Sequence, residues 1–206
     1  MENMPAQRSF QKTLVSILGF LIIALVLYLV ILPFYPILKY NFLKEEVKVA
    51  EQKAASSSRT VLAQEKRVEE NYSGNRLVID KIGVNTSIVE GENENALNRG
   101  AWRAPESSTP SAGGNTVITG HRFKYLPPNN LTFYLLDKLV AGDTILVIWN
   151  DKEYWYLVSE TKIVPPEAME ILNPTDKPIL TLFTCDPIWS QTNRLVVISE
   201  PVEPSP

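Results

Sequence analysis

The chain has 206 residues, of which 45% are hydrophobic, and its formal net charge is -3. This length allows one ordinary domain with accessory segments, and the small net charge without a basic stripe argues against a nucleic-acid partner. One cysteine and one histidine exclude an internal disulfide and make a poor metal site. We therefore expect a chain that needs no metal or other cofactor.

The first predicted element is a membrane anchor. No charged residue occurs from Thr13 to Leu32, and Leu, Ile and Val dominate this stretch. About twenty such residues match a hydrocarbon core of about 30 Å at a rise of about 1.5 Å per residue. A cleaved signal peptide is the alternative, but its apolar region is usually about 7–15 residues long and ends at a small-residue cleavage site. We expect an uncleaved transmembrane anchor over residues 13–32, preceded by a short cytoplasmic tail over residues 1–12.

Basic residues do not orient this anchor by themselves. Arg8 and Lys12 precede it, and Lys39 and Lys44 follow it, so the positive-inside comparison is nearly balanced. The short N-terminal tail and the large C-terminal part favour an N-terminus inside and a C-terminus outside. Residues 33–75 are mostly polar and predict a juxtamembrane linker. A coiled coil is the alternative, although the apolar residues hold no heptad.

After residue 76 the sequence consists of short apolar runs between turn residues. The runs cover residues 77–79, 81–84, 87–89, 116–119, 144–149, 153–158, 179–184 and 194–198. The pair Asn150-Asp151 predicts a hairpin between two of them. Residues 131–139 form the best helical candidate, of one or two turns. Roughly eight short strands without a long helical period indicate a compact barrel or sandwich, with a flexible tail at residues 202–206.

The only cysteine lies at the end of one predicted strand. Side chains alternate along a strand, so residues 180, 182 and 184 are expected to face the core, and Cys185 to face outward with residues 181 and 183. Asp186 and Pro187 then end the strand. This places an accessible thiol on a rigid element. A buried structural thiol is the alternative, because free cysteine often behaves as a small core residue.

Two further residues complete a possible chemical site. Arg194 opens the next strand after a short loop, so a hairpin would bring it close to Cys185. Arginine stays protonated and donates several hydrogen bonds in one plane, which suits an oxyanion or a thiolate. His121 follows a strand and Gly120 and could serve as an acid or base. Each residue by itself could equally have a structural role. Together, Cys185, His121 and Arg194 suffice for acyl transfer through a thioester.

These residues closely resemble the signature of the sortases, which are membrane-anchored cysteine transpeptidases of bacterial surfaces. The signature is carried by residues 181–185 (Thr-Leu-Phe-Thr-Cys) with Arg194 downstream, and by residues 119–121 (Thr-Gly-His) upstream. The resemblance covers residues 76–201, the expected catalytic domain. It implies an all-β fold, an eight-stranded sortase-type β-barrel with short helices, preceded by one transmembrane helix. It also implies a single-pass protein of the bacterial cell membrane with an extracellular catalytic domain.

The resemblance further implies a reaction. Cys185 would attack a C-terminal, LPXTG-like sorting signal of a surface protein, and an amine from a cell-wall precursor or a pilin lysine would resolve the thioester. His121 would be the acid/base and Arg194 the oxyanion-binding or substrate-orienting cation. Two other readings stay open: a membrane-anchored cysteine peptidase that mainly hydrolyses, and a catalytically idle module that binds sorting peptides.

Some finer features follow from the same resemblance. Thr119, Thr184 and Trp189 are expected to line the peptide groove. The sequences His-Arg at 121–122 and Cys-Asp-Pro at 185–187 resemble those of class D or E sortases. The loop acids Glu92, Glu94 and Asp176 are interpreted as scattered surface carboxylates, rather than as a calcium site.

Overall fold

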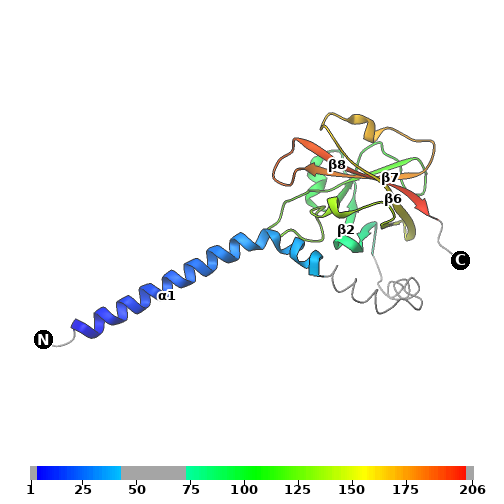
Figure 1. The fold of residues 1–206 in the computed structure, drawn as a ribbon. Helices are drawn as coiled ribbons and strands as arrows, with labels where there is room; N and C mark the ends of the chain where they lie inside the picture. The colour runs from blue at the N-terminus through cyan, green and yellow to red at the C-terminus, as the bar shows by residue number, and fades with distance from the viewer. Residues whose placement is uncertain (1–3, 43–72, 203–206) are drawn as a thin grey trace.

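The computed structural model describes residues 4–42 and 73–202, which form a long N-terminal helix and a β-barrel (Figure 1). Helix α1 spans Met4–Ile31, the 3-10 helix η1 spans Leu32–Phe34, and residues 35–42 are again helical. Lys12–Phe42 is long and apolar enough to cross a membrane by length and composition. This agrees with the predicted anchor. Residues 43–72 of the predicted linker lie outside the described residues.

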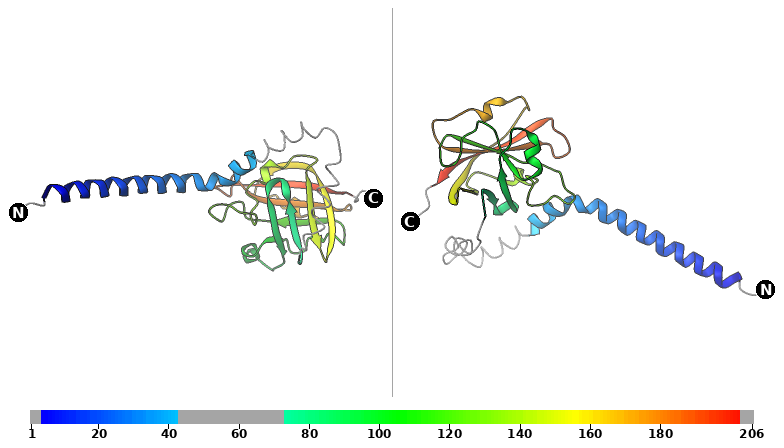
Figure 2. Two further views of the ribbon diagram at one scale, coloured as in Figure 1. Left: turned by 90° about the horizontal axis from the view of Figure 1, so that it is seen from below. Right: turned by 180° about the vertical axis from the view of Figure 1, so that it is seen from behind.

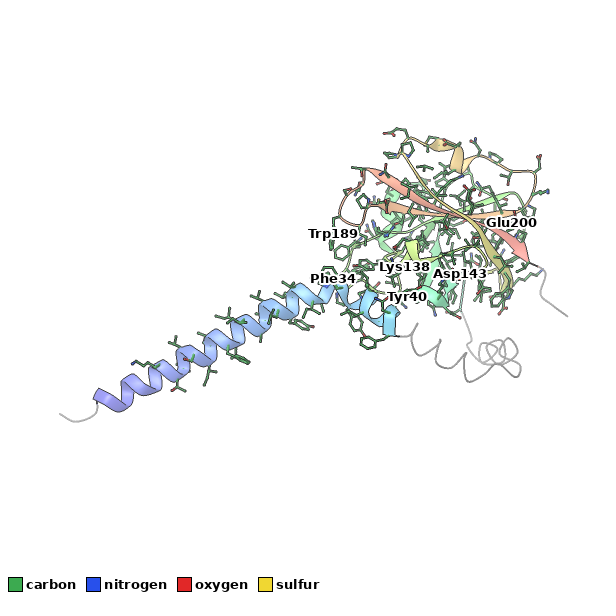
Figure 3. The ribbon with its side chains drawn as sticks, in the orientation of Figure 1. Phe34, Tyr40, Lys138, Asp143, Trp189 and Glu200 are labelled. Atoms are coloured by element: carbon green, nitrogen blue, oxygen red, sulfur yellow. The ribbon has the colours of Figure 1, made fainter. Side chains whose placement is uncertain are left out.

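The helical segment after the anchor contacts the barrel. Ile37 and Tyr40 pack against the hydrophobic core of the barrel, and the Tyr134 hydroxyl donates a hydrogen bond of 2.9 Å to the carbonyl oxygen of Pro33. Figure 3 shows Phe34 and Tyr40 where the helix meets the barrel. The first part of the predicted linker, residues 33–42, thus includes a segment packed on the barrel.

Eight strands close into a barrel in the order β1-β2-β3-β4-β7-β8-β6-β5, and Figure 2 shows two further views of it. This confirms the predicted eight-stranded barrel. The strands are β1 (Arg76–Ile79), β2 (Val84–Val89), β3 (Ala101–Arg103), β4 (Asn115–Thr119), β5 (Thr144–Trp149), β6 (Lys152–Val164), β7 (Ile179–Asp186) and β8 (Asn193–Val202). The short 3-10 helices between them are η2 (Asp80–Ile82), η3 (Glu94–Asn98), η4 (Leu136–Lys138) and η5 (Met169–Leu172).

The inward-facing side chains of the strands fill the barrel. Strand β2 shows the alternation most clearly, because every second residue from Val84 is buried. Leu180 and Leu182 of β7 and Ile118 of β4 have no exposed surface. Full burial of such a side chain stabilises a fold by about 1.5–3 kcal/mol. The well-packed β4 and β7 therefore give a rigid base to the residues at their ends.

The structure corrects one predicted element between β1 and β2 and adds one strand that the sequence did not predict. Residues 81–84 do not form a separate strand: η2 follows β1 directly, and Gly83 adopts a left-handed conformation with φ of 67°. This turn lets Val84 pair back with Ile79, and glycine accepts positive φ without steric cost. Strand β3 was not predicted, because its three residues are too short for a periodic signal.

The helical segment predicted over residues 131–139 is confirmed only for one short turn, the 3-10 helix η4. The Phe133 amide donates to the His121 carbonyl oxygen at 2.8 Å, so a tertiary hydrogen bond takes the place of a helical one. The predicted hairpin at Asn150 and Asp151 is confirmed between β5 and β6. Both residues have positive φ, 50° and 60°, as a two-residue hairpin turn of type I′ requires.

Candidate active site

Strands β7 and β8 place Cys185 opposite Arg194. The two strands are antiparallel, and Cys185 pairs with Arg194 in their register, which confirms the predicted hairpin proximity. Cys185 is a free, half-buried thiol. The alternation predicted along β7 holds for Leu180, Leu182 and Thr184, which are buried. Thr181 is an exception, because it is buried although it was predicted to face outward, and its hydroxyl donates a hydrogen bond to the Asn115 side chain.

Strand β4 brings the histidine to the same end of the barrel. It runs parallel to β7, with Thr119 paired to Phe183, and the Gly120 amide donates to the Phe183 carbonyl oxygen at 3.4 Å. His121 and Cys185 each lie two residues after the members of this pair, Thr119 and Phe183. The backbone register thus places the histidine and the cysteine on adjacent segments, 64 positions apart in the sequence.

Two threonine hydroxyls brace this junction. Thr119 donates to the carbonyl oxygen of Phe183 at 3.0 Å, and Thr184 donates to the carbonyl oxygen of Gly120 at 2.7 Å. Their exposed fractions are only 7% and 1%. These hydroxyls therefore tie β4 to β7 directly beside His121 and Cys185. A role for either threonine in lining a peptide groove remains a prediction.

Gly120 is needed for the close packing under His121. A Cβ atom at this position would lie 3.0 Å from the ring of Phe133, which is fully buried. A side chain here would push Phe133 or the His121 segment out of place. The glycine therefore lets the chain turn tightly over the aromatic core before it reaches His121.

The environment of His121 favours the neutral imidazole. Desolvation by burial lowers the pKa of His121 below its ordinary value, Lys124 lowers it further by charge repulsion, and Glu94 acts in the opposite direction. Because one ring nitrogen of a neutral imidazole can accept a proton, the side chain is available as a base at neutral pH. Folding stability should consequently rise with pH between the lowered folded pKa and the unfolded value, where the unfolded chain binds more protons.

The opposing charges of Lys124 and Glu94 predict that two variants shift the pKa of His121 in opposite directions. Replacing Lys124 by glutamine should raise the pKa of His121, and replacing Glu94 by glutamine should lower it. The measurement is a proton NMR titration of the imidazole, which is unambiguous because the chain has one histidine. A matched substitution of Lys152, on β6, should leave the midpoint unchanged. Shifts of the same sign in both variants would contradict this electrostatic explanation.

Arg194 is anchored by the loop that precedes it. One of its terminal nitrogens donates to the carbonyl oxygens of Gln191 and Asn193, at 3.2 Å and 3.0 Å. The guanidinium has five N–H donors, so other donors stay available to a bound group. A fixed, cationic set of donors on the residue paired with Cys185 suits the stabilisation of a developing negative charge.

A second arginine at the site, Arg122, was noted in the sequence only as part of the His-Arg pair that resembles class D or E sortases, without a role in the site. Arg122 is buried, with only 4% of its side chain exposed, and forms ion pairs with Asp137 and Asp186. Asp186 directly follows Cys185. The sequence shows Arg122 next to His121, but its acidic partners are 15 and 64 residues away. Only the folded topology brings these charges together.

Trp189 lies on the loop between β7 and β8. Its side chain is 65% exposed, and its ring meets the ring of Phe123 edge-on with centroids 4.5 Å apart. Phe123 follows His121 by two residues and also contacts Tyr134. Figure 3 shows Trp189 at the edge of the barrel on the side of helix α1. The indole is therefore mostly exposed, although it packs against Phe123.

Metal ligation finds no support within residues 4–42 and 73–202. They contain no group of three His, Cys, Asp or Glu side chains that could hold an ion. Glu92, Glu94 and Asp176 are exposed. Asp176 borders a separate hollow of about 420 Å³, at the end of the barrel where β4 and β7 begin. This hollow is therefore not part of the site around Cys185.

Comparisons with known proteins agree with this arrangement. Residues 77–202 match the sortase domain family. Sortase A of Listeria monocytogenes is 27% identical over 60% of this chain and 54% of its own length. Sortase D of Bacillus subtilis is 27% identical over 69% of this chain and 73% of its own length. The chain covers little more than half of the sortase A relatives from Listeria monocytogenes and Bacillus anthracis.

Solved structures show the same barrel. The structure of sortase C-1 from Actinomyces oris superposes with a TM-score of 0.58 and 27% identity, over 72% of this chain and 85% of that one. Sortase A of Listeria monocytogenes gives a TM-score of 0.55 and 25% identity, over 63% of this chain and 86% of that one. Sortases are cysteine transpeptidases that attach proteins to the cell wall. With its domain match, its relatives and its closed barrel, the chain belongs to the sortase family.

Proposed function

We propose that this chain is a transpeptidase that cleaves a C-terminal, LPXTG-like sorting signal and transfers the acyl part to an amine. The observation that carries the proposal is the register that sets Cys185 opposite Arg194, with His121 on the adjacent segment. A nucleophile, an acid/base and a fixed cation are what acyl transfer through a covalent intermediate requires.

The reacting form of the site has Cys185 as a thiolate and His121 protonated, and the lowered pKa of His121 makes protonated His121 the smaller fraction at neutral pH. In the first half of the proposed reaction, this thiolate attacks the threonine carbonyl carbon of the sorting signal. Negative charge develops on the carbonyl oxygen, and Arg194 stabilises it by hydrogen bonds. The C–N bond then breaks, and His121 gives a proton to the leaving amine. The products are a thioester at Cys185 and a free glycine amine.

In the second half, an acceptor amine attacks the thioester carbonyl while His121, now neutral, takes its proton. The C–S bond breaks, and Cys185 is regenerated as an amide forms. The proposed acceptors are a cell-wall precursor and a pilin lysine. Water in place of the amine would give hydrolysis, and an idle peptide-binding module would form no thioester, so product analysis separates these alternatives.

The proposed setting is the outer face of a bacterial cell membrane. The apolar helix would cross the membrane once with its N-terminus inside. The barrel would then meet surface proteins that carry sorting signals. The contact between Tyr134 and Pro33 supports a barrel held close to the end of the anchor. Of the residues predicted to bind substrate, Trp189 is the exposed one, and we propose that its indole contacts the peptide.

Replacing Arg194 by alanine is expected to slow acylation by about 10²-fold or more, because the hydrogen bonds that Arg194 donates to the oxyanion are lost. Lysine at this position should recover only part of the rate, since it keeps the charge without the planar donors. The measurement is the single-turnover rate of thioester formation. Arg99→Ala, on an exposed residue that binds the Glu90 carbonyl oxygen, is the matched control. Equal rates in Arg194→Ala and the control would assign Arg194 a structural role.

The function is tested by incubating the membrane-reconstituted chain with a library of sorting-type peptides and an amine acceptor. Mass spectrometry should detect an amide-linked product that combines the peptide up to threonine with the acceptor. Release of the same peptide with a free carboxylate only would indicate a peptidase. Absence of any cleavage across a broad library would contradict the proposal.

A further inference from the structure

The side chain that follows His121 is unusually well held. Arg122 is 4% exposed, and arginine is rarely buried to this extent unless it is paired. Its Nε donates to the Tyr134 carbonyl oxygen at 3.0 Å, one terminal nitrogen to Asp137 at 3.0 Å, and the other to Asp186 at 3.4 Å. All three nitrogens of the guanidinium are thus engaged.

These contacts connect the two segments that carry the proposed chemistry. Asp186 is the last residue of β7 and directly follows Cys185. Asp137 belongs to η4, and the nearby Phe133 amide holds the His121 carbonyl oxygen. Arg122 therefore ties the chain after β4 to the end of β7. A shift of either segment would change the placement of the imidazole relative to the thiol.

The charges around Arg122 also act on the thiol. Burial lowers the pKa of Arg122, while Asp137 and Asp186 raise it by attraction. Cys185, next to Asp186 in the sequence, also raises the pKa of Arg122 by attraction. Because the thiolate is the attacking form, a nearby cation favours reaction and the adjacent Asp186 carboxylate opposes it. The ion pair between Arg122 and Asp186 counters this opposition.

We propose that Arg122 is a positioning residue of the site, which holds the His121 segment and the Cys185 strand end together and neutralises Asp186 beside the thiol. This goes beyond the roles assigned to Cys185, His121 and Arg194. Its kinetic consequence rests on the proposed function, whereas its effect on the thiol does not. Among the described residues, the charged and titratable groups on the backbone segments next to Cys185 are Asp186 of β7, Arg194 of β8, and His121 and Arg122 after β4.

The direct test is the rate at which iodoacetamide alkylates Cys185, the only thiol in the chain. The full chain in lipid nanodiscs at pH 7 is compared with Arg122→Met, Asp186→Asn and the double variant. Arg122→Met should alkylate about tenfold more slowly, because Asp186 is left unpaired beside the thiol. Asp186→Asn alone should not slow alkylation. The double variant should return to within about twofold of the original rate.

Arg103→Met is the matched control, because Arg103 also lies in an ion pair, with Glu90, and belongs to β3. It should alkylate at the original rate. An unchanged rate in Arg122→Met would overturn the proposal. So would a double variant as slow as Arg122→Met, since that result would show a general disturbance of the fold rather than an effect through Asp186.

A second variant keeps the test decisive if Arg122→Met does not fold. Arg122→Lys retains the charge and should keep the alkylation rate, but a single ammonium cannot reproduce three directed hydrogen bonds. With a cleavable peptide, its kcat should fall by about 10²-fold at an unchanged KM, as expected for misplaced catalytic groups. An unchanged kcat would contradict the positioning role. If the chain cleaves no peptide at all, the proposed function fails, and the alkylation rates still decide the role of Arg122.

Discussion

Replacement of Cys185 by alanine is expected to lower peptide cleavage and transfer by about 10⁴-fold or more, as loss of a catalytic nucleophile does in other acyl-transfer enzymes. No other thiol exists in the chain, so no second cysteine can take over. Cys185 is half-buried at a strand end, and removal of one sulfur atom should leave the barrel folded. The measurement is product formation by mass spectrometry, together with the thermal unfolding midpoint.

Serine at the same position is the matched control for shape. It preserves hydrogen-bonding capacity, but an alcohol ionises far less readily than a thiol and is a weak nucleophile without further activation. We expect Cys185→Ser to be nearly as inactive as the alanine variant. Undiminished product with Cys185→Ala would place the reaction elsewhere in the protein.

The second large effect is expected from His121→Gln, which should slow amide cleavage by about 10³-fold, within the range of general acid–base catalysis. Glutamine can still form hydrogen bonds but cannot transfer a proton. The lowered pKa of His121 means that its protonated form decreases as the pH rises above that value. The rate of amide cleavage by the original chain should therefore fall as the pH rises above the pKa of His121, and the variant should not show this fall.

The nature of the leaving group tests this assignment sharply. A p-nitrophenyl ester of the same peptide releases a phenolate that does not need a proton. His121→Gln should therefore slow ester cleavage by only about tenfold or less. The comparison uses the acylation rates of both substrates with both proteins. Equal losses for amide and ester would show that His121 does not protonate the leaving group.

The sequence predicted the elements whose local pattern is strong. The alternation before Cys185 and the apolar run after Arg194 indicated two strands, and a short loop between them implied a hairpin. The structure confirms both strands and the predicted hairpin, in which Cys185 pairs with Arg194. The uncharged stretch from Thr13 likewise matches the long N-terminal helix. In each case the hydrophobic pattern of residues adjacent in the sequence is enough to predict the helix or strand.

What the sequence missed depends on contacts between distant segments. The hydrogen bond from Phe133 to His121 replaces the helix that residues 131–139 suggest by themselves. The ion pairs of Arg122 join residues from three parts of the barrel. The packing of Tyr40 on the core depends on how the barrel meets the anchor. Such interactions leave no periodic pattern in the chain.

The most direct test of a thioester mechanism is to detect the acyl-enzyme itself. The full chain is incubated with an LPXTG-like peptide without an acceptor amine, and the reaction is quenched in acid. After digestion, the mass of the fragment that contains Cys185 is measured by mass spectrometry. The expected result is a mass increase equal to the peptide up to its threonine, removable by hydroxylamine and absent in Cys185→Ala. Peptide cleavage with no adduct on Cys185, or an adduct on another residue, would contradict the mechanism.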